Sequence, residues 1–165
     1  MHRRLFLFAV CATVCWFGCN RRLPLANAHG SADALGFAVL DALAHSDRTK
    51  LDELVLTEQE FRDHVWPDLP AARPERNLPF SYVWRDLKQK SAYSLAETLS
   101  THAGQHYELI AIRFLGETTP YHTYRVHRKA ELTVKSAAGA TLPLRLFGSV
   151  LEKDRRFKIF SYVVD

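Results

Sequence analysis

The spacing of apolar residues changes once along the chain, near residue 107, and this change constrains the fold class. Before it, apolar residues recur every three or four positions, as in Leu35, Val39 and Leu43, which is typical of amphipathic helices. After it, apolar and polar residues alternate, which is typical of strands with one buried face. We therefore expect an α+β domain in which N-terminal helices pack on one face of an antiparallel sheet.

The first half predicts three helical pieces. Ser31 or Asp33 is placed to cap the first of them. Residues 51–55 indicate a short second piece. Thr57 and Glu60 have the spacing of a capping box, so a third piece should begin there.

A stiff loop and one long helix should follow. Residues 67–79 contain four of the seven prolines, which fix the backbone and remove hydrogen-bond donors. From Phe80 to Ala103 the helical spacing returns, and Gly104 is the residue expected to end that helix in the left-handed conformation.

Four alternating runs make up the second half of the chain. Turn signals separate them at 116–120, 138–139 and 153–154. Consecutive strands joined by short turns predict a four-stranded antiparallel meander, curved and cone-like, with one face buried. The apolar positions, run by run, are Ile110, Ile112 and Phe114; Tyr124, Val126, Ala130, Leu132 and Val134; Leu142, Leu144 and Leu146; Phe157, Ile159 and Val163.

The N-terminus has the pattern of an export signal. Four residues with two arginines precede an uncharged run of fifteen, Leu5 to Cys19, which is shorter than a bilayer-spanning helix requires. The end of the run, Gly18-Cys19, resembles a bacterial lipoprotein signal, in which the cysteine is lipidated and becomes the new N-terminus. We thus expect residues 1–19 to be the signal, 20–30 a tether and 31–165 a single domain.

Two alternatives to lipidation at Cys19 remain open. Ala26-Asn27-Ala28 is a small-x-small site, so cleavage after Ala28 would release a soluble periplasmic or secreted form. An uncleaved membrane anchor is the third reading. All three place the protein outside the cytoplasm or at a membrane.

Charge and cysteine content exclude several classes of function. Lys and Arg number 22 and Asp and Glu 18, and two of the basic residues, Arg3 and Arg4, lie in the signal, so the remaining chain is near +2. A nucleic-acid partner would need clustered basic charge, which the sequence lacks. Because all three cysteines fall within residues 1–19, we expect no disulfide, thiol nucleophile or cysteine-ligated metal in the domain.

The layout resembles the nuclear transport factor 2-like superfamily. The resemblance rests on helices followed by a sheet and on the final segments 146–152 (LFGSVLE) and 157–162 (FKIFSY). It implies the cone-shaped fold shared with ketosteroid isomerase. Because this fold hosts enzymes, binding modules and dimeric adaptors, the resemblance leaves function open and makes a homodimer through the outer sheet face one expectation.

Enzymes of that superfamily hold acid–base residues in the cone pocket. Tyr82 and Asp86 lie one helical turn apart on the long helix, and His122 and Tyr124 share one parity on the second run. Asp86, His122 and Tyr124 are the candidate catalytic residues, since an apolar pocket moves the pKa of a carboxyl group toward the working range. The alternative reading makes Asp86 a solvated helix residue, places His122 in a turn and lets Tyr124 pack.

Arg128 is the one charged residue at an inward position of its run. A buried guanidinium must be paired, and Asp86, Glu97 and Glu108 are the possible partners. One interpretation is that Arg128, with Tyr82, faces the pocket and binds an anionic ligand. A bulge near His127 that turns Arg128 to water, or a purely structural ion pair, is the alternative.

The histidines do not form a metal-binding pattern. His102 and His106 are separated by the helix-ending Gly104, and His122 and His127 differ by an odd number on a strand. We therefore expect no metal and no cofactor. The chain is expected to be a lipid-anchored, non-catalytic domain that binds a small ligand or a protein at the bacterial cell envelope; the alternative is an isomerase- or dehydratase-like enzyme.

Overall fold

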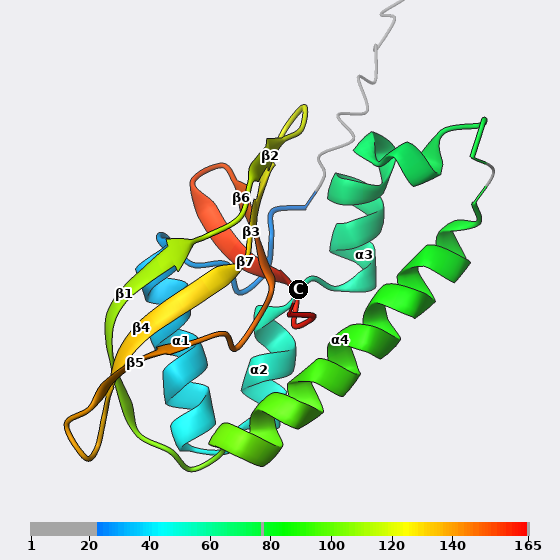
Figure 1. Ribbon diagram of the computed structural model, residues 1–165. Coiled ribbons are helices and arrows are strands. Elements are labelled where there is room, and N and C mark those ends of the chain that lie inside the picture. The colour runs from blue at the N-terminus through cyan, green and yellow to red at the C-terminus, as the bar shows by residue number, and fades with distance from the viewer. Residues whose placement is uncertain (1–22, 77, 165) are drawn as a thin grey trace, which may run out of the picture.

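The computed structural model describes residues 23–76 and 78–164, and it is α+β, as the change of period predicts (Figure 1). The expected signal and Cys19 lie outside the described residues. The helices are α1 (Ala32–Ala44), α2 (Arg48–Leu54), α3 (Glu58–Glu60) and α4 (Phe80–His102). The strands are β1 (Tyr107–Phe114), β2 (Thr118–Pro120), β3 (Arg125–Arg128), β4 (Ala130–Ser136), β5 (Thr141–Leu144), β6 (Ser149–Lys153) and β7 (Arg156–Ser161).

The helix starts follow the expected capping. The Ser31 hydroxyl accepts the Ala34 N–H at 3.0 Å, and the reciprocal capping box between Thr57 and Glu60 is formed. After α3 the chain continues through a π-helical turn (Phe61–Val65) and a 3₁₀ turn that contains Pro67, because proline cannot extend an α-helix.

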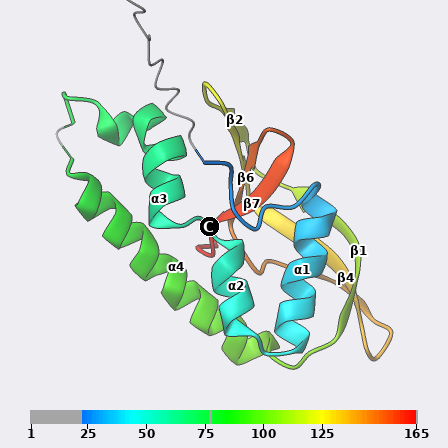
Figure 2. The same ribbon diagram turned by 180° about the vertical axis from the view of Figure 1, so that it is seen from behind.

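The long helix α4 ends where the glycine predicts. Gly104 has φ +74°, and its N–H donates to the Leu43 carbonyl at 2.8 Å, which ties the end of α4 to the end of α1. Along its length α4 buries only Ser91, Leu95 and Thr98. Both views show it lying along the outside of the molecule (Figures 1 and 2).

The prediction of a single four-stranded sheet is wrong. In the part of the chain that the structure describes, all strand pairs are antiparallel, but seven strands form a sheet ordered β1-β4-β5 and a second sheet ordered β2-β3-β6-β7. The expected second run is divided into β3 and β4 at Lys129, which has φ +55°. The third run is likewise divided into β5 and β6, and residues 118–120, expected as a turn, form the short strand β2.

The chain crosses between the two sheets at a tightly packed seam. An ideal Cβ on Gly148 would lie 1.7 Å from the Val163 carbonyl oxygen, so only glycine fits there. The Gly148 carbonyl accepts the Ala130 N–H at 3.0 Å. This hydrogen bond joins the connection between β3 and β4 to the connection between β5 and β6. The seam thereby fixes the start of β6 beside the end of β3.

Helices cover both faces of the four-stranded sheet, not one as predicted. On one face Val150 and Ile159 join the core built around α1 and α2. On the other, Val126 and Leu151 pack with Phe61 and the residues around α3. The three-stranded sheet packs on α1 through one face only, and Ile110 on its outer side is 55% exposed.

Candidate functional site

The inner side of α4 is bordered by two cavities, one along each flank. Positions 84, 88 and 91 line one cavity and positions 83, 86 and 90 line the other, which matches two adjacent stripes of a helix. Leu87 and Phe160 line both cavities and so form the partition between them. The helix is therefore held over the sheet with a hollow on each side.

The first hollow, here called the α2–α4 cavity, has a volume of about 480 Å³. It lies between α2, the start of α3, α4 and the end of β7. Its apolar lining consists of Val55, Leu56, Trp84, Leu87, Leu95 and Phe160.

The polar groups inside the α2–α4 cavity are already satisfied by the protein. The Tyr162 hydroxyl donates to the Leu51 carbonyl at 2.7 Å, and the Ser91 hydroxyl accepts the Tyr162 N–H at 3.0 Å. Burial raises the pKa of the Tyr162 phenol, so it stays neutral. The interior consequently offers a ligand mainly apolar surface.

Charges stand at the rim of this cavity. Arg48 pairs with Asp52 at 3.6 Å, and Glu58 pairs with Arg62 at 2.8 Å. Lys88 makes no ion pair or hydrogen bond to any residue that the structure describes. The rim therefore carries one uncompensated positive charge.

The second hollow, here called the Arg128 cavity, has a volume of about 330 Å³. From α4 it receives Asp86 and Lys90, and from the strand ends Arg128, Ser149 and Ser161. It is more polar than the α2–α4 cavity, and it contains two of the residues singled out by the sequence, Asp86 and Arg128.

The three candidate catalytic residues do not come together. Asp86 is exposed and accepts a hydrogen bond from Lys90 at 2.8 Å, and this bond raises the pKa of the Lys90 ammonium. His122 and Tyr124 line a depression at the turns β2–β3 and β6–β7, away from the Arg128 cavity. The Tyr124 hydroxyl donates to the Val65 carbonyl at 3.2 Å, and burial raises its pKa.

Arg128 is not buried, contrary to the parity of its run. The left-handed residue Lys129 turns the chain immediately after it, and Arg128 is left exposed at the mouth of its cavity. Among the described residues it pairs with none of the expected partners, which include Glu97 and Glu108. Tyr82, the other expected ligand contact, is 55% exposed and lines neither cavity.

Sequence reasoning missed a hydroxyl–imidazole–carboxylate row on the four-stranded sheet. The two His127 ring nitrogens lie 2.9 Å from Thr118 Oγ1 and 2.9 Å from Glu152 Oε2, and the ring stacks on Phe114 at 4.5 Å. Thr118 and His127 line neither cavity beneath α4, so no hollow there holds a substrate against them. The described residues hold no cluster of three or more His, Cys, Asp or Glu suited to a metal.

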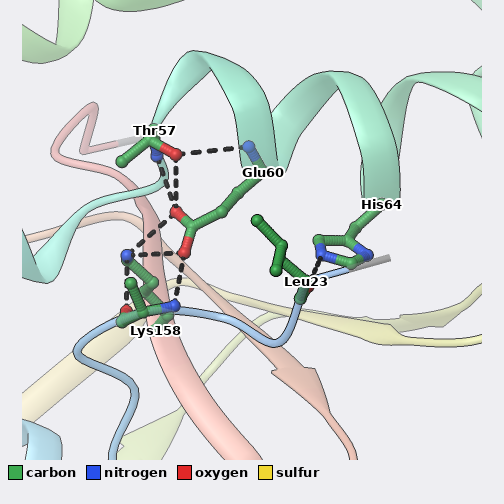
Figure 3. A network of polar contacts seen from close by, with 6 residues as sticks. Leu23, Thr57, Glu60, His64 and Lys158 are labelled. Atoms are coloured by element: carbon green, nitrogen blue, oxygen red, sulfur yellow. Dashed lines mark hydrogen bonds and ion pairs between the residues drawn. The ribbon is translucent and has the colours of Figure 1, made fainter. Parts of the chain in front are cut away.

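A buried ion pair clamps the segment before α1 (Figure 3). Lys158, with no exposed surface, contacts both Glu60 carboxylate oxygens at 2.9 and 3.0 Å and donates to the Ala26 carbonyl at 2.7 Å. Glu60 in turn accepts the Ala26 N–H at 2.7 Å, and His64 Nε2 lies 2.7 Å from the Leu23 carbonyl oxygen. Within residues 23–29, expected to belong to a tether, Leu23, Ala26 and His29 are hydrogen-bonded to the domain.

The electrostatics of the clamp favour the ionised carboxylate. Burial opposes ionisation of Glu60, but the hydrogen bond from the Thr57 N–H and the contact with Lys158 outweigh it, so the pKa of Glu60 is lowered. Lys158 is buried because helices cover both faces of this sheet.

No protein-family model matches the chain, and neither does any curated protein or solved structure. Within residues 23–76 and 78–164, no helix has both the length and the apolar composition needed to cross a bilayer.

Proposed function

We propose that this chain is a non-catalytic binding domain, exported and lipid-anchored at the bacterial cell envelope, that holds a small, mostly apolar molecule in the α2–α4 cavity. The observation that carries the proposal is the lining of that cavity. Its interior side chains are apolar or internally hydrogen-bonded, and charged groups are confined to its rim. Such a cavity favours a ligand by burial of apolar surface.

The size of the cavity supports a small molecule as its occupant. A volume of about 480 Å³ lies in the range of ordinary small-molecule sites. The walls come from three helices and one strand, so much of the site is formed before a ligand arrives. A preformed site reduces the entropy cost of binding.

The enzymatic alternative requires a proton-transfer group and a partner that sets its pKa, both close to the substrate. Its candidate residues are Asp86, His122 and Tyr124. Asp86 lines a different hollow from His122 and Tyr124, and the Tyr124 hydroxyl donates its hydrogen bond to a backbone carbonyl. Binding is therefore the better-supported proposal.

The clamp supports lipidation at Cys19 over cleavage after Ala28. Cleavage after Ala28 would remove Leu23 and Ala26, and with them hydrogen bonds to His64, Glu60 and Lys158. Losing the bonds to the ion pair of Glu60 and Lys158 costs about 1.5–3 kcal/mol each. A chain cleaved before Cys19 keeps them all.

The ligand proposal is tested by blocking the cavity. Ala92 and Ala96 are both exposed on α4, but only Ala92 lines the α2–α4 cavity. The full-length chain and its Ala92→Trp and Ala96→Trp variants are titrated with the apolar fluorophore N-phenyl-1-naphthylamine under identical conditions. We expect saturable binding that Ala92→Trp weakens at least tenfold and Ala96→Trp leaves unchanged. Equal binding by both variants would contradict the proposal.

The processing proposal is tested by the mass of the mature protein. The full-length gene is expressed in a bacterial host, and the intact mass of the membrane-associated protein is determined. We expect a chain that begins at the acylated Cys19, and a Cys19→Ala variant that is not acylated. A soluble mature chain beginning at His29 would refute the lipid anchor.

A further inference from the structure

Three polar side chains form a row across the end of the four-stranded sheet. Arg128 on β3 pairs in register with Ser149 on β6, and Ser149 pairs with Ser161 on β7. Directly opposite residues of antiparallel strands place their side chains on the same face, with Cβ atoms about 4.5–5.5 Å apart. All three residues line the Arg128 cavity.

The donors of this row are free. Arg128 has no ion pair or hydrogen bond among the described residues, and neither serine hydroxyl bonds another described side chain or carbonyl. Ser149 and Ser161 are only 8% and 6% exposed. In the described part of the chain, His64 Nδ1 is the one fully buried side-chain polar atom without a partner, so both hydroxyls reach the solvent of the cavity.

The backbone around the row is fixed by close contacts. Gly116 packs closely against Arg128, because a Cβ on Gly116 would lie 2.9 Å from the Arg128 Cβ. Between Ser149 and Val150 the register of β6 and β7 shifts, which makes Phe160 the extra residue of a bulge. The bulge explains why Phe160 and Ser161, although adjacent, both line the Arg128 cavity.

The charged and apolar residues that line the Arg128 cavity indicate the class of ligand that it can bind. Lys90 and Arg128 are positive and Asp86 is negative, so the balance is one positive charge. A guanidinium fits a carboxylate through two parallel hydrogen bonds, and a hydroxyl can donate a third. Apolar side chains, including Phe61 and Phe160, supply a floor for a compact hydrocarbon body.

We propose that the Arg128 cavity is a second binding site, for a small organic carboxylate whose anionic group meets Arg128, Ser149 and Ser161. Its volume of about 330 Å³ suits a compact acid. The proposal does not depend on the α2–α4 cavity, because Ala92 does not line this second site.

The test uses benzoate and inorganic phosphate as probes. The full-length chain is titrated with each by calorimetry, with Arg128→Gln as the test variant and Arg113→Gln as the matched control. Arg113 is an exposed strand residue that does not line the cavity, so both variants lose the same charge. We expect saturable benzoate binding that weakens at least tenfold in Arg128→Gln and is unchanged in Arg113→Gln.

Further measurements separate the outcomes. Ser149→Ala should weaken benzoate severalfold without lowering the melting temperature, whereas Ala92→Trp should leave benzoate binding intact. Phosphate that binds as tightly as benzoate would contradict an organic ligand. Equal benzoate binding by Arg128→Gln and Arg113→Gln, or no saturable binding to the unmodified chain, would overturn the proposed site.

Discussion

Helices α1 and α4 cover the same domain in opposite ways. Six of the thirteen residues of α1 are buried, whereas α4 buries three of its twenty-three. Leu35, Val39 and Leu43 of α1 have no exposed surface. Helix α1 therefore completes the core, while α4 forms a wall over two hollows.

The contacts of α4 explain how it remains in place. Near its start, Trp84 and Phe80 pack their rings against Phe61, with centroids 5.4 and 6.0 Å apart. Near its end, Leu95 is buried and the Thr98 hydroxyl donates to the Leu146 carbonyl at 3.4 Å. Between these attachments only the Leu87–Phe160 partition interrupts the hollows. A helix attached in this way can border a binding site without sealing it.

The largest expected difference concerns two ion pairs. Lys158 pairs with Glu60 inside the domain, and Lys90 pairs with Asp86 on the surface of α4. Lys158→Met should lower the free energy of unfolding by about 3–5 kcal/mol, because it leaves a buried carboxylate without its cation. Lys90→Met should leave it almost unchanged, since exposed pairs contribute little.

Urea unfolding monitored by circular dichroism measures both changes. The double variant Glu60→Leu/Lys158→Met serves as the control and should recover much of the loss, because it removes both charges together. A similar loss of unfolding free energy in Lys158→Met and Lys90→Met would show that the two ion pairs are equally solvated. That result would contradict the difference between a buried and an exposed pair.

A smaller difference is expected between two leucines. Leu43 on α1 is fully buried, so Leu43→Ala should destabilise the domain by about 2–5 kcal/mol. Leu87 on α4 is partly exposed and borders a hollow on each side, so Leu87→Ala should cost about 1 kcal/mol. The same substitution removes part of the partition between the cavities. Thermal unfolding of both variants checks this, and a loss for Leu87→Ala equal to that for Leu43→Ala would mean that α4 is a core helix.

The helices were predictable because their signals are local. The capping box of Thr57 and Glu60 and the left-handed Gly104 act within a few residues. The division into two sheets was not predictable from the sequence. Val126 on β3 and Ala130 on β4 are an even number of residues apart, so buried positions keep the same parity on both sides of Lys129. Only the left-handed backbone of Lys129 separates the strands, and lysine gives no sign of it.

The site was less accessible to sequence reasoning than the fold. Alternation assigned Arg128 to the buried side of its run, and the structure leaves it exposed. The partner of Lys158 is 98 residues away in the chain, so no local pattern links it to Glu60. No sequence pattern indicates Ser149 and Ser161, because their position in one row with Arg128 depends on strand register.

The proposed binding site beneath α4 is tested most directly by locating a bound apolar probe on the protein. Amide and indole resonances of the isotope-labelled full-length chain are followed by NMR while N-phenyl-1-naphthylamine is added. We predict saturable shifts for the Trp84 indole and the Ser91 and Ala92 amides, with little change along α1. Shifts centred on the exposed Ile110 of β1, or none above the nonspecific background, would contradict a binding site beneath α4.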